Sequence, residues 1–442
     1  MMISFYILYV QEMLNKEQQK AVEAVLEGHN VFITGEPGTG KSFTMKHIIA
    51  KLKDLGRRFA ITSSTGCSAV LIGGQTVHSY LGMGTGSKTI DKIVEGIKGK
   101  KLDDLQKLQI LIIDEISMID NHTLEKMSSI MQRIKKEYAR AFGGVQVIFI
   151  GDFCQLPPVS GNYCFLSDVW KQLGFTCIIL KELVRQQDDP EFQQILHEIR
   201  IGKCSHSTFQ RLKALKDTKF EDGQKATRLY SLNSHVDLVN QHEFMKIFKR
   251  NRCTGNITEC SPRLSMPTVE YNHIEASEKD IYKYKACSTD RNLNLEDYHI
   301  TLMIGLQVIV IRNINFETGL VNGTSGIICG MDESSVCIVD NKKQKHIIEY
   351  HTDINENNNT HVKFMPLKLA YALSIHKSQG ATLDAIEVDG STFIFAPGQL
   401  YTAISRARSL NRIRLLNLDK DSFICNNNVK EFYENLSANS LE

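Results

Sequence analysis

The stretch NVFITGEPGTGKSFTMKHIIAKL, residues 30–52, places a glycine-rich turn between an apolar run and a segment with helical spacing. The run from Val31 to Thr34 is apolar and β-branched, as is typical of a buried strand. The turn from Gly35 to Ser42 fits the pattern GxxxxGK[ST], in which backbone N–H groups and the positive end of a helix bind phosphate. The stretch therefore predicts an α/β fold built around a nucleotide phosphate site.

Seven of the eight residues of this turn have an expected role in binding nucleotide. Lys41 is expected to reach the β- and γ-phosphates, and Ser42 to bind magnesium. The remaining loop residues that would surround the phosphates are Gly35, Pro37, Gly38, Thr39 and Gly40. No guanine-specifying NKxD segment is found in the chain, so ATP with Mg²⁺ is the expected ligand. The alternative, a glycine turn with an exposed lysine, is disfavoured by the flanking strand and helix.

A second apolar run, LQILIIDEIS, ends in two adjacent carboxylates, Asp114 and Glu115. Asp114 suits the magnesium shell, and Glu115 suits a base that polarises water for in-line attack on the γ-phosphate. Such a pair alone is weak evidence, because strand ends often face solvent. After a phosphate loop in the same chain, the pair predicts ATP hydrolysis.

The rest of the chain continues the alternation of strands and helices that is typical of parallel sheets. Expected strands are Val31–Thr34, Phe59–Thr62, Ile110–Asp114, Val145–Gly151 and Cys177–Leu180, and a second set beginning at Thr227, Leu367 and Arg412. Between the halves of the second set the chain becomes polar with short alternating runs, which predicts a small all-β insertion. Another polar stretch, Gly84 to Leu105, predicts a smaller insertion in the first sheet.

Composition restricts the class of protein and its compartment. Among 442 residues, 52 Lys and Arg stand against 50 Asp and Glu, so any groups that bind nucleic acid must be gathered locally. The 11 cysteines show no CxxC or metal-finger spacing, which indicates an intracellular, reducing compartment. The apolar start, residues 1–12, lacks the features of a signal peptide, and no stretch reaches membrane length, so a soluble protein is expected.

From about Leu14 to Asn417, ordered blocks of the sequence resemble the PIF helicases, within the RecD-like branch of superfamily 1B DNA helicases. The most specific block is AFGGVQVIFIGDFCQLPPV, Ala141 to Val159. The resemblance implies two RecA-like P-loop NTPase motor domains with small accessory insertions. The expected parts are a leader at 1–12, motor domain 1 at 13–180 with an insertion at about 84–105, motor domain 2 at 181–252 and 363–442, and an SH3-like domain at 253–362.

The resemblance also implies further residues around ATP. In LNKEQQKAV, Gln18 matches the adenine-recognition block, since an amide offers both a donor and an acceptor to the base. Gln155 would sense the γ-phosphate. Arg185 in ELVRQQD and Arg406 in GQLYTAISRARS match family arginines that reach the γ-phosphate from the second motor domain, where guanidinium groups stabilise the charge on the transferring phosphoryl.

Three blocks resemble strand-contacting segments of the family: ITSSTGCSAVLIGGQTVHSYLGMG, SLNSHVDLVN and PLKLAYALSIHKSQGATLD. Hydroxyl, lysine and backbone donors in such loops bind phosphates without reading bases. The blocks nominate Thr65, Gly66, His78, Ser79, Asn233, His376, Lys377, Ser378, Gln379 and Thr382. Two alternatives stay open: His78 as a packed histidine and Asn233 as a helix cap.

The resemblance implies an ATP-dependent DNA helicase that moves 5′ to 3′ on single-stranded DNA, and a monomeric motor is expected. It would unwind forked or structured duplexes in replication, recombination, repair or telomere maintenance. Two alternatives are an RNA-directed translocase and a nucleic-acid-binding subunit with a vestigial ATP site. Against the second, the set of Lys41, Asp114, Glu115, Gln155 and Arg406 is complete.

Overall fold

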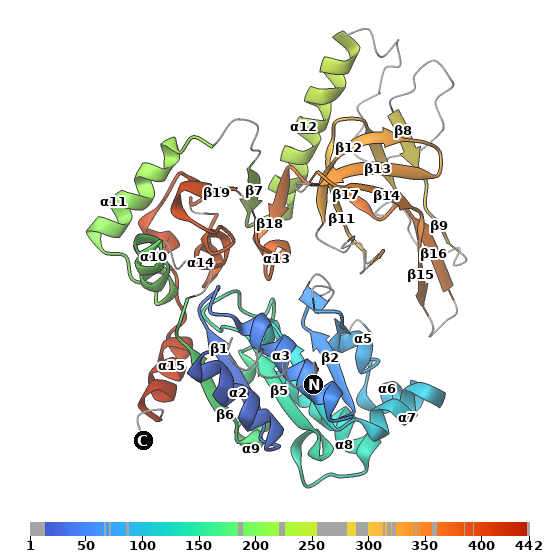
Figure 1. The fold of residues 1–442 in the computed structure, drawn as a ribbon, viewed down its shortest axis with the longest axis vertical. Helices are drawn as coiled ribbons and strands as arrows, with labels where there is room; N and C mark the ends of the chain where they lie inside the picture. Colours follow the sequence, from blue (N-terminus) through green and yellow to red (C-terminus); the bar gives the residue numbers. More distant parts are fainter. Residues whose placement is uncertain are drawn as a thin grey trace, which may run out of the picture. The chain divides into compact units, whose positions relative to one another are not determined.

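The chain forms two compact units in the computed structural model, Met1–Lys225 with Ile375–Glu442, and Ala226–Ser374 (Figure 1). The described residues are 14–65, 68–69, 72–84, 88–183, 189–220, 226–253, 281–288, 299–312, 314–315, 320, 324–340, 343–355, 360–383, 385–391 and 393–439. The expected leader at 1–12 and two candidate site residues, Gly66 and Arg185, lie outside the described residues.

The first unit contains a six-stranded sheet in the order β3-β2-β4-β5-β1-β6, in which every pairing is parallel. Its strands are β1 (Val31–Gly35), β2 (Phe59–Ser63), β3 (Gln75–Thr76), β4 (Ile110–Asp114), β5 (Gln146–Ile150) and β6 (Thr176–Leu180). The predicted α/β class with a parallel sheet is confirmed, and so are the five strands expected in this part of the chain. Since β5 lies between β1 and β4, the carboxyl ends of these three strands share one edge of the sheet.

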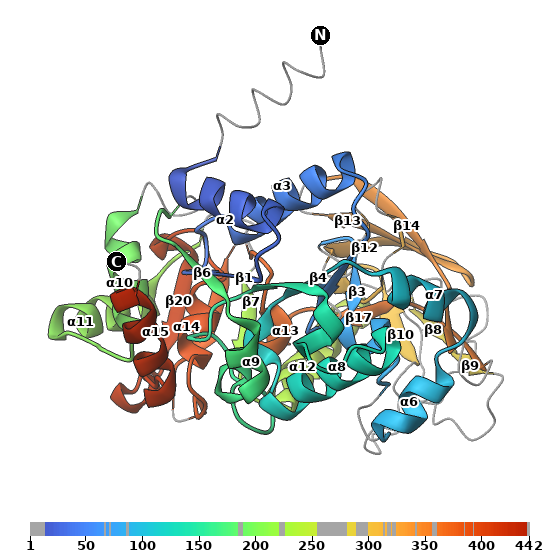
Figure 2. The same ribbon diagram turned by 90° about the horizontal axis from the view of Figure 1, so that it is seen from below.

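Helices cover both faces of this sheet. Figure 2 shows α2 (Lys16–Leu26) and α3 (Lys41–Asp54) on one face, and α8 (Asn121–Lys135) and α9 (Asp168–Leu173) on the other. Helix α8 begins where it does because the Asp120 side chain accepts a hydrogen bond from the Thr123 N–H and caps the helix. Helix α5 (Val77–Tyr80) precedes the expected insertion near residues 84–105, in which α6 (Ile90–Gly96) and α7 (Gly99–Lys107) lie.

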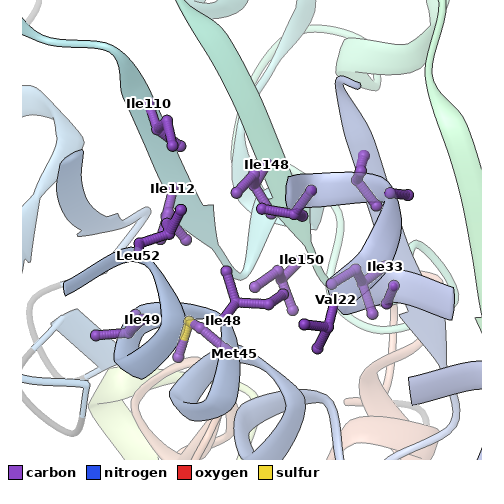
Figure 3. Packing of buried hydrophobic residues seen from close by; sticks show 14 of the residues in the cluster. Val22, Ile33, Met45, Ile48, Ile49, Leu52, Ile110, Ile112, Ile148 and Ile150 are labelled. Carbon is purple, nitrogen blue, oxygen red and sulfur yellow. The ribbon is translucent and has the colours of Figure 1, made fainter. Parts of the chain in front are cut away.

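The core between α3 and the sheet holds the phosphate loop in place. Met45, Ile48 and Leu52 recur at helical spacing on α3 and are almost fully buried. They pack in one cluster with Ile33 of β1 and Ile112 of β4 (Figure 3). Burying an aliphatic side chain of this size contributes about 1.5–3 kcal/mol. The start of α3 is therefore fixed against the ends of the strands that carry the site.

Two later segments complete the first unit. After β6 come α10 (Pro190–Arg200) and α11 (His206–Ala214). The second segment contains α13 (Ile375–Ser378), β19 (Ile386–Asp389), α14 (Gln399–Ile404), β20 (Ile413–Leu416) and α15 (Asn427–Asn439). Strands β19 and β20 pair in parallel, and β20 confirms the strand expected near Arg412.

The second unit is mainly β-structure. Its elements are β7 (Thr227–Tyr230), α12 (Asn233–Cys253), β8 (Ile281–Tyr284), β9 (Cys287–Ser288), β10 (Ile300–Met303), β11 (Gln307–Val310), β12 (Ser325–Met331), β13 (Ser335–Asp340), β14 (Lys345–Glu349), β15 (His351–Asn355), β16 (Thr360–Phe364), β17 (Leu367–Leu369) and β18 (Ala372–Ser374). The antiparallel sheets have the orders β14-β13-β12-β11-β17, β15-β16-β9 and β10-β8. The SH3-like barrel expected here stays a prediction.

One predicted strand is wrong in its extent. The run LKLAYALSI from Leu367 is divided into β17, which pairs antiparallel with β11, and β18, which pairs parallel with β7. The division has a local cause, because the Asn240 side chain accepts hydrogen bonds from the backbone N–H groups of Tyr371 and Ala372. Because these two N–H groups donate to a side chain of α12, they are not available for pairing with a neighbouring strand at the point where β17 and β18 separate. Ile375 already belongs to the next helix.

No helix within the described ranges combines the length and the apolar character that crossing a bilayer requires.

Candidate nucleotide and strand site

The carboxyl ends of three adjacent strands carry the candidate site. The phosphate loop leaves β1 at Gly35, Asp114 ends β4, and Asp152 follows β5. Ligands of open parallel sheets bind outside the carboxyl ends of the strands. The strand order β4-β5-β1 therefore brings Lys41 of the phosphate loop close to the predicted pair of carboxylates, Asp114 and Glu115.

The phosphate loop closes around Lys41. Its ammonium group donates hydrogen bonds to the carbonyl oxygens of Gly35 at 2.7 Å and Glu36 at 2.9 Å. Burial lowers the pKa of Lys41, and the carboxylates of Asp152 and Glu115 oppose this effect. An anionic phosphate near this nitrogen would further favour the charged lysine.

Glycine is required at the start of α3. Gly40 has φ of +87°, and a Cβ atom there would lie 2.5 Å from Nε2 of Gln18. In the same loop Pro37 and Thr39 are buried, and Gly38 is half-buried. The backbone at the start of α3 therefore depends on the second glycine of the GxxxxGK[ST] pattern, whereas the contact of the loop with phosphate stays a prediction.

Gln18 lies against this loop. Its Oε1 accepts a hydrogen bond from the Asn15 N–H at 3.1 Å, and its Nε2 donates to the Thr39 carbonyl at 3.5 Å. An amide oxygen accepts two hydrogen bonds and an amide nitrogen donates two, so each atom keeps one position for another partner. This arrangement is compatible with adenine recognition, which stays a prediction for Gln18.

The two carboxylates after β4 differ in their surroundings. Burial, and then the neighbouring Glu115 charge, raises the pKa of Asp114 to about 7. Ser42 is exposed at the start of α3, so its hydroxyl and the Asp114 carboxylate offer the hard oxygen ligands that Mg²⁺ prefers. A bound cation would favour the ionised form of Asp114. The residues present therefore fit the expected metal.

Glu115 adopts an uncommon backbone conformation, with φ of +53°. Strain of this kind in a residue other than glycine costs on the order of 1–3 kcal/mol and gathers at functional sites. Its Oε2 accepts a hydrogen bond from Nε2 of Gln379 at 2.9 Å. Gln379 was expected to contact the nucleic acid strand, but its side chain is buried against the candidate base.

Asp152 forms the centre of a buried polar network that sequence reasoning missed. Arg200 donates two hydrogen bonds to its carboxylate, at 3.2 and 3.1 Å. The hydroxyls of Tyr401 and Tyr433 each donate one at 3.0 Å, and the Cys154 N–H donates one at 3.1 Å. Burial alone would raise the pKa of Asp152, but Arg200, Lys41 and the Cys154 N–H together outweigh burial and lower it. The only local signal was the GD pair at the end of a strand, since the Arg200 and tyrosine partners are distant in sequence.

Gln155 and Arg406, which are predicted to reach the γ-phosphate, also belong to the first unit. The Arg406 guanidinium donates to the carbonyls of Thr402 at 2.9 Å and Ala381 at 3.2 Å. Gln155 is 3% exposed, and its Oε1 accepts no hydrogen bond from any residue that the structure describes. Their contact with phosphate stays a prediction.

The first block of predicted strand contacts lies near β2 and β3. Thr65 is half-buried, and its hydroxyl accepts a hydrogen bond from the Ser68 N–H at 3.3 Å. His78 is half-buried on α5, where burial lowers its pKa. Ser79 is exposed, and its N–H donates to the Thr76 side chain that caps α5.

The third block, PLKLAYALSIHKSQGATLD, surrounds α13. Lys377 and Thr382 are exposed, whereas His376 is half-buried with a pKa that burial lowers. The Ser378 hydroxyl is fully buried and donates to the Ile375 carbonyl at 2.8 Å, so this donor is already used. Asn233 belongs to the second unit, where it is the first residue of α12.

Comparison with known proteins gives consistent similarities. The chain matches the family model for PIF1-like helicase over residues 13–210 and that for the DNA helicase Pif1 2B domain over residues 293–331. It is 32% identical to the ATP-dependent DNA helicase PIF1 of Danio rerio, over 98% of this chain and 66% of that protein, so it spans slightly less than two thirds of this relative.

Two solved structures share the whole fold. The crystal structure of Pif1 helicase from Candida albicans matches with a TM-score of 0.81 and 30% identity, over 96% of this chain and 99% of that one. Pif1 helicase from Bacteroides in complex with ADP-AlF3 and single-stranded DNA matches with a TM-score of 0.73 and 26% identity, over 96% and 98% of the two chains.

Proposed function

Because this chain belongs to the PIF1-like helicase family, we propose that it is an ATP-dependent DNA helicase that moves along single-stranded DNA and separates the duplex ahead. The observation that carries this proposal is the common sheet edge where Lys41 and the Asp114–Glu115 pair meet. The related Bacteroides protein binds both a nucleotide analogue and single-stranded DNA, which supports the same two ligands here.

In the proposed hydrolysis, a water oxygen attacks the γ-phosphorus in line with the bond to ADP. One proton of the water passes to Glu115 as the bond to ADP breaks, and Lys41 stabilises negative charge on the phosphates. Mg²⁺ held by Ser42 and Asp114 would neutralise further charge on the phosphates. Gln155, Arg185 and Arg406 are proposed to contact the γ-phosphate, with Gln18 against the adenine.

The proposed DNA contacts are gathered locally and do not depend on an overall positive field. With a formal net charge of +2, the chain has no overall positive field, so affinity depends on local groups such as the exposed Lys377. The other proposed contacts are Thr65, Gly66, His78, Ser79, Asn233, His376, Ser378 and Thr382. Binding through phosphates gives strong salt dependence and little sequence preference.

The remaining parts of the proposal follow the family resemblance. The two motor domains would be residues 13–180 and residues 181–252 with 363–442, acting in one monomer that moves 5′ to 3′. Replication, recombination, repair and telomere maintenance are the processes in which such unwinding is needed.

The first test is ATP turnover by the Lys41→Ala variant. We expect kcat to fall at least about 100-fold, since a charge on the phosphates loses its stabilising partner, while single-strand binding stays within a few fold. Lys46→Ala is the matched control, because Lys46 is exposed on the same helix. Normal hydrolysis by Lys41→Ala would show that the site is wrong, and an inactive wild-type protein would favour the vestigial-subunit alternative.

The second test compares unwinding of duplexes with a 5′ tail, a 3′ tail or no tail. Unwinding of the 5′-tailed duplex alone supports the proposed direction, and unwinding of the 3′-tailed duplex alone contradicts it. Stimulation of ATPase activity by single-stranded RNA equal to or above that by DNA would favour the RNA-directed alternative.

A further inference from the structure

The Gln379 side chain joins the loop after α13 to the candidate base. Its Nε2 donates to Oε2 of Glu115 at 2.9 Å and lies 3.4 Å from the Ser117 hydroxyl. Gln379 is 2% exposed, and its neighbour Lys377 is exposed. The amide is therefore directed into the site rather than toward solvent, unlike the lysine two residues before it.

The other polar atom of this amide has no partner among the described residues. Oε1 of Gln379 is buried and accepts no hydrogen bond from the residues that the structure describes. Buried amide oxygens are nearly always paired, so an unpaired one beside a candidate base indicates a group that binds there. A water molecule has two protons, and Glu115 and Oε1 of Gln379 offer one acceptor each.

The surrounding backbone holds this amide close to the carboxylate. Gly380 follows with φ of +78°, and a Cβ atom there would lie 3.4 Å from Oε1 of Glu115. The loop is also tied to Arg406, which donates to the Ala381 carbonyl and accepts from the Leu383 N–H at 3.0 Å. The distance between Gln379 and Glu115 is therefore set by a loop that is packed and bonded on both sides.

We propose that Gln379 is a positioning residue for ATP hydrolysis, which orients Glu115 through Nε2 and aligns the attacking water through Oε1. During attack, one water proton passes to Glu115 and the other stays on the oxygen, hydrogen-bonded to Oε1. That oxygen forms the new bond to the γ-phosphorus as the bond to ADP breaks. This inference rests on the proposed function, since it assigns a role within the same reaction.

The test uses Gln379→Glu, which keeps the shape of the side chain but removes the Nε2 donor. We expect kcat for ATP in the presence of single-stranded DNA to fall roughly 10- to 100-fold, the effect of losing a hydrogen bond to a charged group. The KM for ATP and the affinity for single-stranded DNA stay within about twofold, because Gln379 acts on the attack and not on binding. Gln106→Ala, an exposed glutamine of α7, serves as the control and keeps wild-type kcat.

A double variant separates positioning from a merely structural role. In Glu115→Gln the base is absent, so adding Gln379→Glu should lower the remaining rate by less than about threefold. Gln379→Ala, checked for folding by circular dichroism and thermal melting, should lose at least as much kcat as Gln379→Glu, because it removes the Oε1 acceptor as well as the Nε2 donor.

Three results would overturn the inference: wild-type kcat in Gln379→Glu, a rise in KM that accounts for the whole loss, or full additivity with Glu115→Gln. Each requires that the wild-type protein hydrolyses ATP. A wild-type protein without ATPase activity would instead refute the proposed function, so the two failures are distinguishable.

Discussion

Replacing Arg200 by methionine would leave the buried carboxylate of Asp152 without its charged partner. Asp152 is fully buried, and the Arg200 side chain is 11% exposed. Methionine is close to arginine in length but carries no donor, so the substitution removes both hydrogen bonds and the ion pair. The expected result is a large loss of stability in the first unit.

The size of this loss follows from the contacts that remain. Removing one partner of a buried ion pair costs about 3–5 kcal/mol, because the other charge stays desolvated. Asp152 keeps donors from Tyr401, Tyr433 and Cys154. Each of these bonds to a charged group contributes about 1.5–3 kcal/mol. We therefore expect the lower end of the range, about 3 kcal/mol in the free energy of unfolding.

The chain offers a local probe for this measurement. It has one tryptophan, Trp170, whose ring lies 5.2 Å from Phe32 and 6.0 Å from Phe432 between ring centroids. Phe432 precedes Tyr433 on α15, so Trp170 fluorescence during urea unfolding reports on the first unit. With an m-value of about 2 kcal/mol/M, the midpoint should fall by roughly 1–2 M.

A double-mutant cycle and a matched control complete the test. The pair Arg200→Met and Asp152→Asn should show a coupling energy of about 2–3 kcal/mol, because the two groups are in direct contact. Arg211→Met removes an arginine from an exposed pair with Glu191, and should change stability by less than about 1 kcal/mol. If Arg200→Met lies within about 1 kcal/mol of the wild type at an unchanged m-value, the assigned role of this network is refuted.

Three further outcomes are expected. Tyr433→Phe should lower the free energy of unfolding by about 1–2 kcal/mol in the same urea assay, since Asp152 loses a donor and the Phe153 N–H loses its acceptor. The pKa of Asp152 is lower in the folded than in the unfolded chain, so its ionised carboxylate stabilises the fold above about pH 3.9, and this contribution is lost as the pH falls through the folded-state pKa. Below about pH 3.9, the urea midpoint of the wild type should therefore drop more steeply than that of Asp152→Asn. Gly40→Ala should weaken ATP binding at least about tenfold in a nucleotide titration, because the new Cβ strains the loop and meets Gln18.

Much of the first unit could be predicted because its signals are local. The run before Gly35 is continuously apolar, and the observed strand Val31–Gly35 differs from the prediction by one residue. A phosphate loop depends on consecutive residues with special backbone conformations, so its pattern is visible in sequence. The same holds for Asp114 and Glu115, which directly end a buried strand.

Predictions were weaker where a residue's partner comes from elsewhere in the chain. LKLAYALSI was expected as one strand, but Asn240 from a different element binds the backbone between its two halves. The block PLKLAYALSIHKSQGATLD resembles a strand-contacting segment and so predicts a strand contact for Gln379, and only the fold shows that its side chain turns inward to Glu115. A residue's neighbours in sequence do not determine which way its side chain points in a tight loop.

The α/β class, the phosphate loop and the adjacent carboxylates can be read from the residues alone, because strand burial and loop conformation follow from residue types at short spacing. The pairing of Asp152 with Arg200, its hydrogen bonds from two tyrosine hydroxyls and the bond from Gln379 to Glu115 became visible only in the folded chain. These contacts join residues separated by 48 to 281 positions. Their formation depends on how strands and helices pack, which no short pattern encodes.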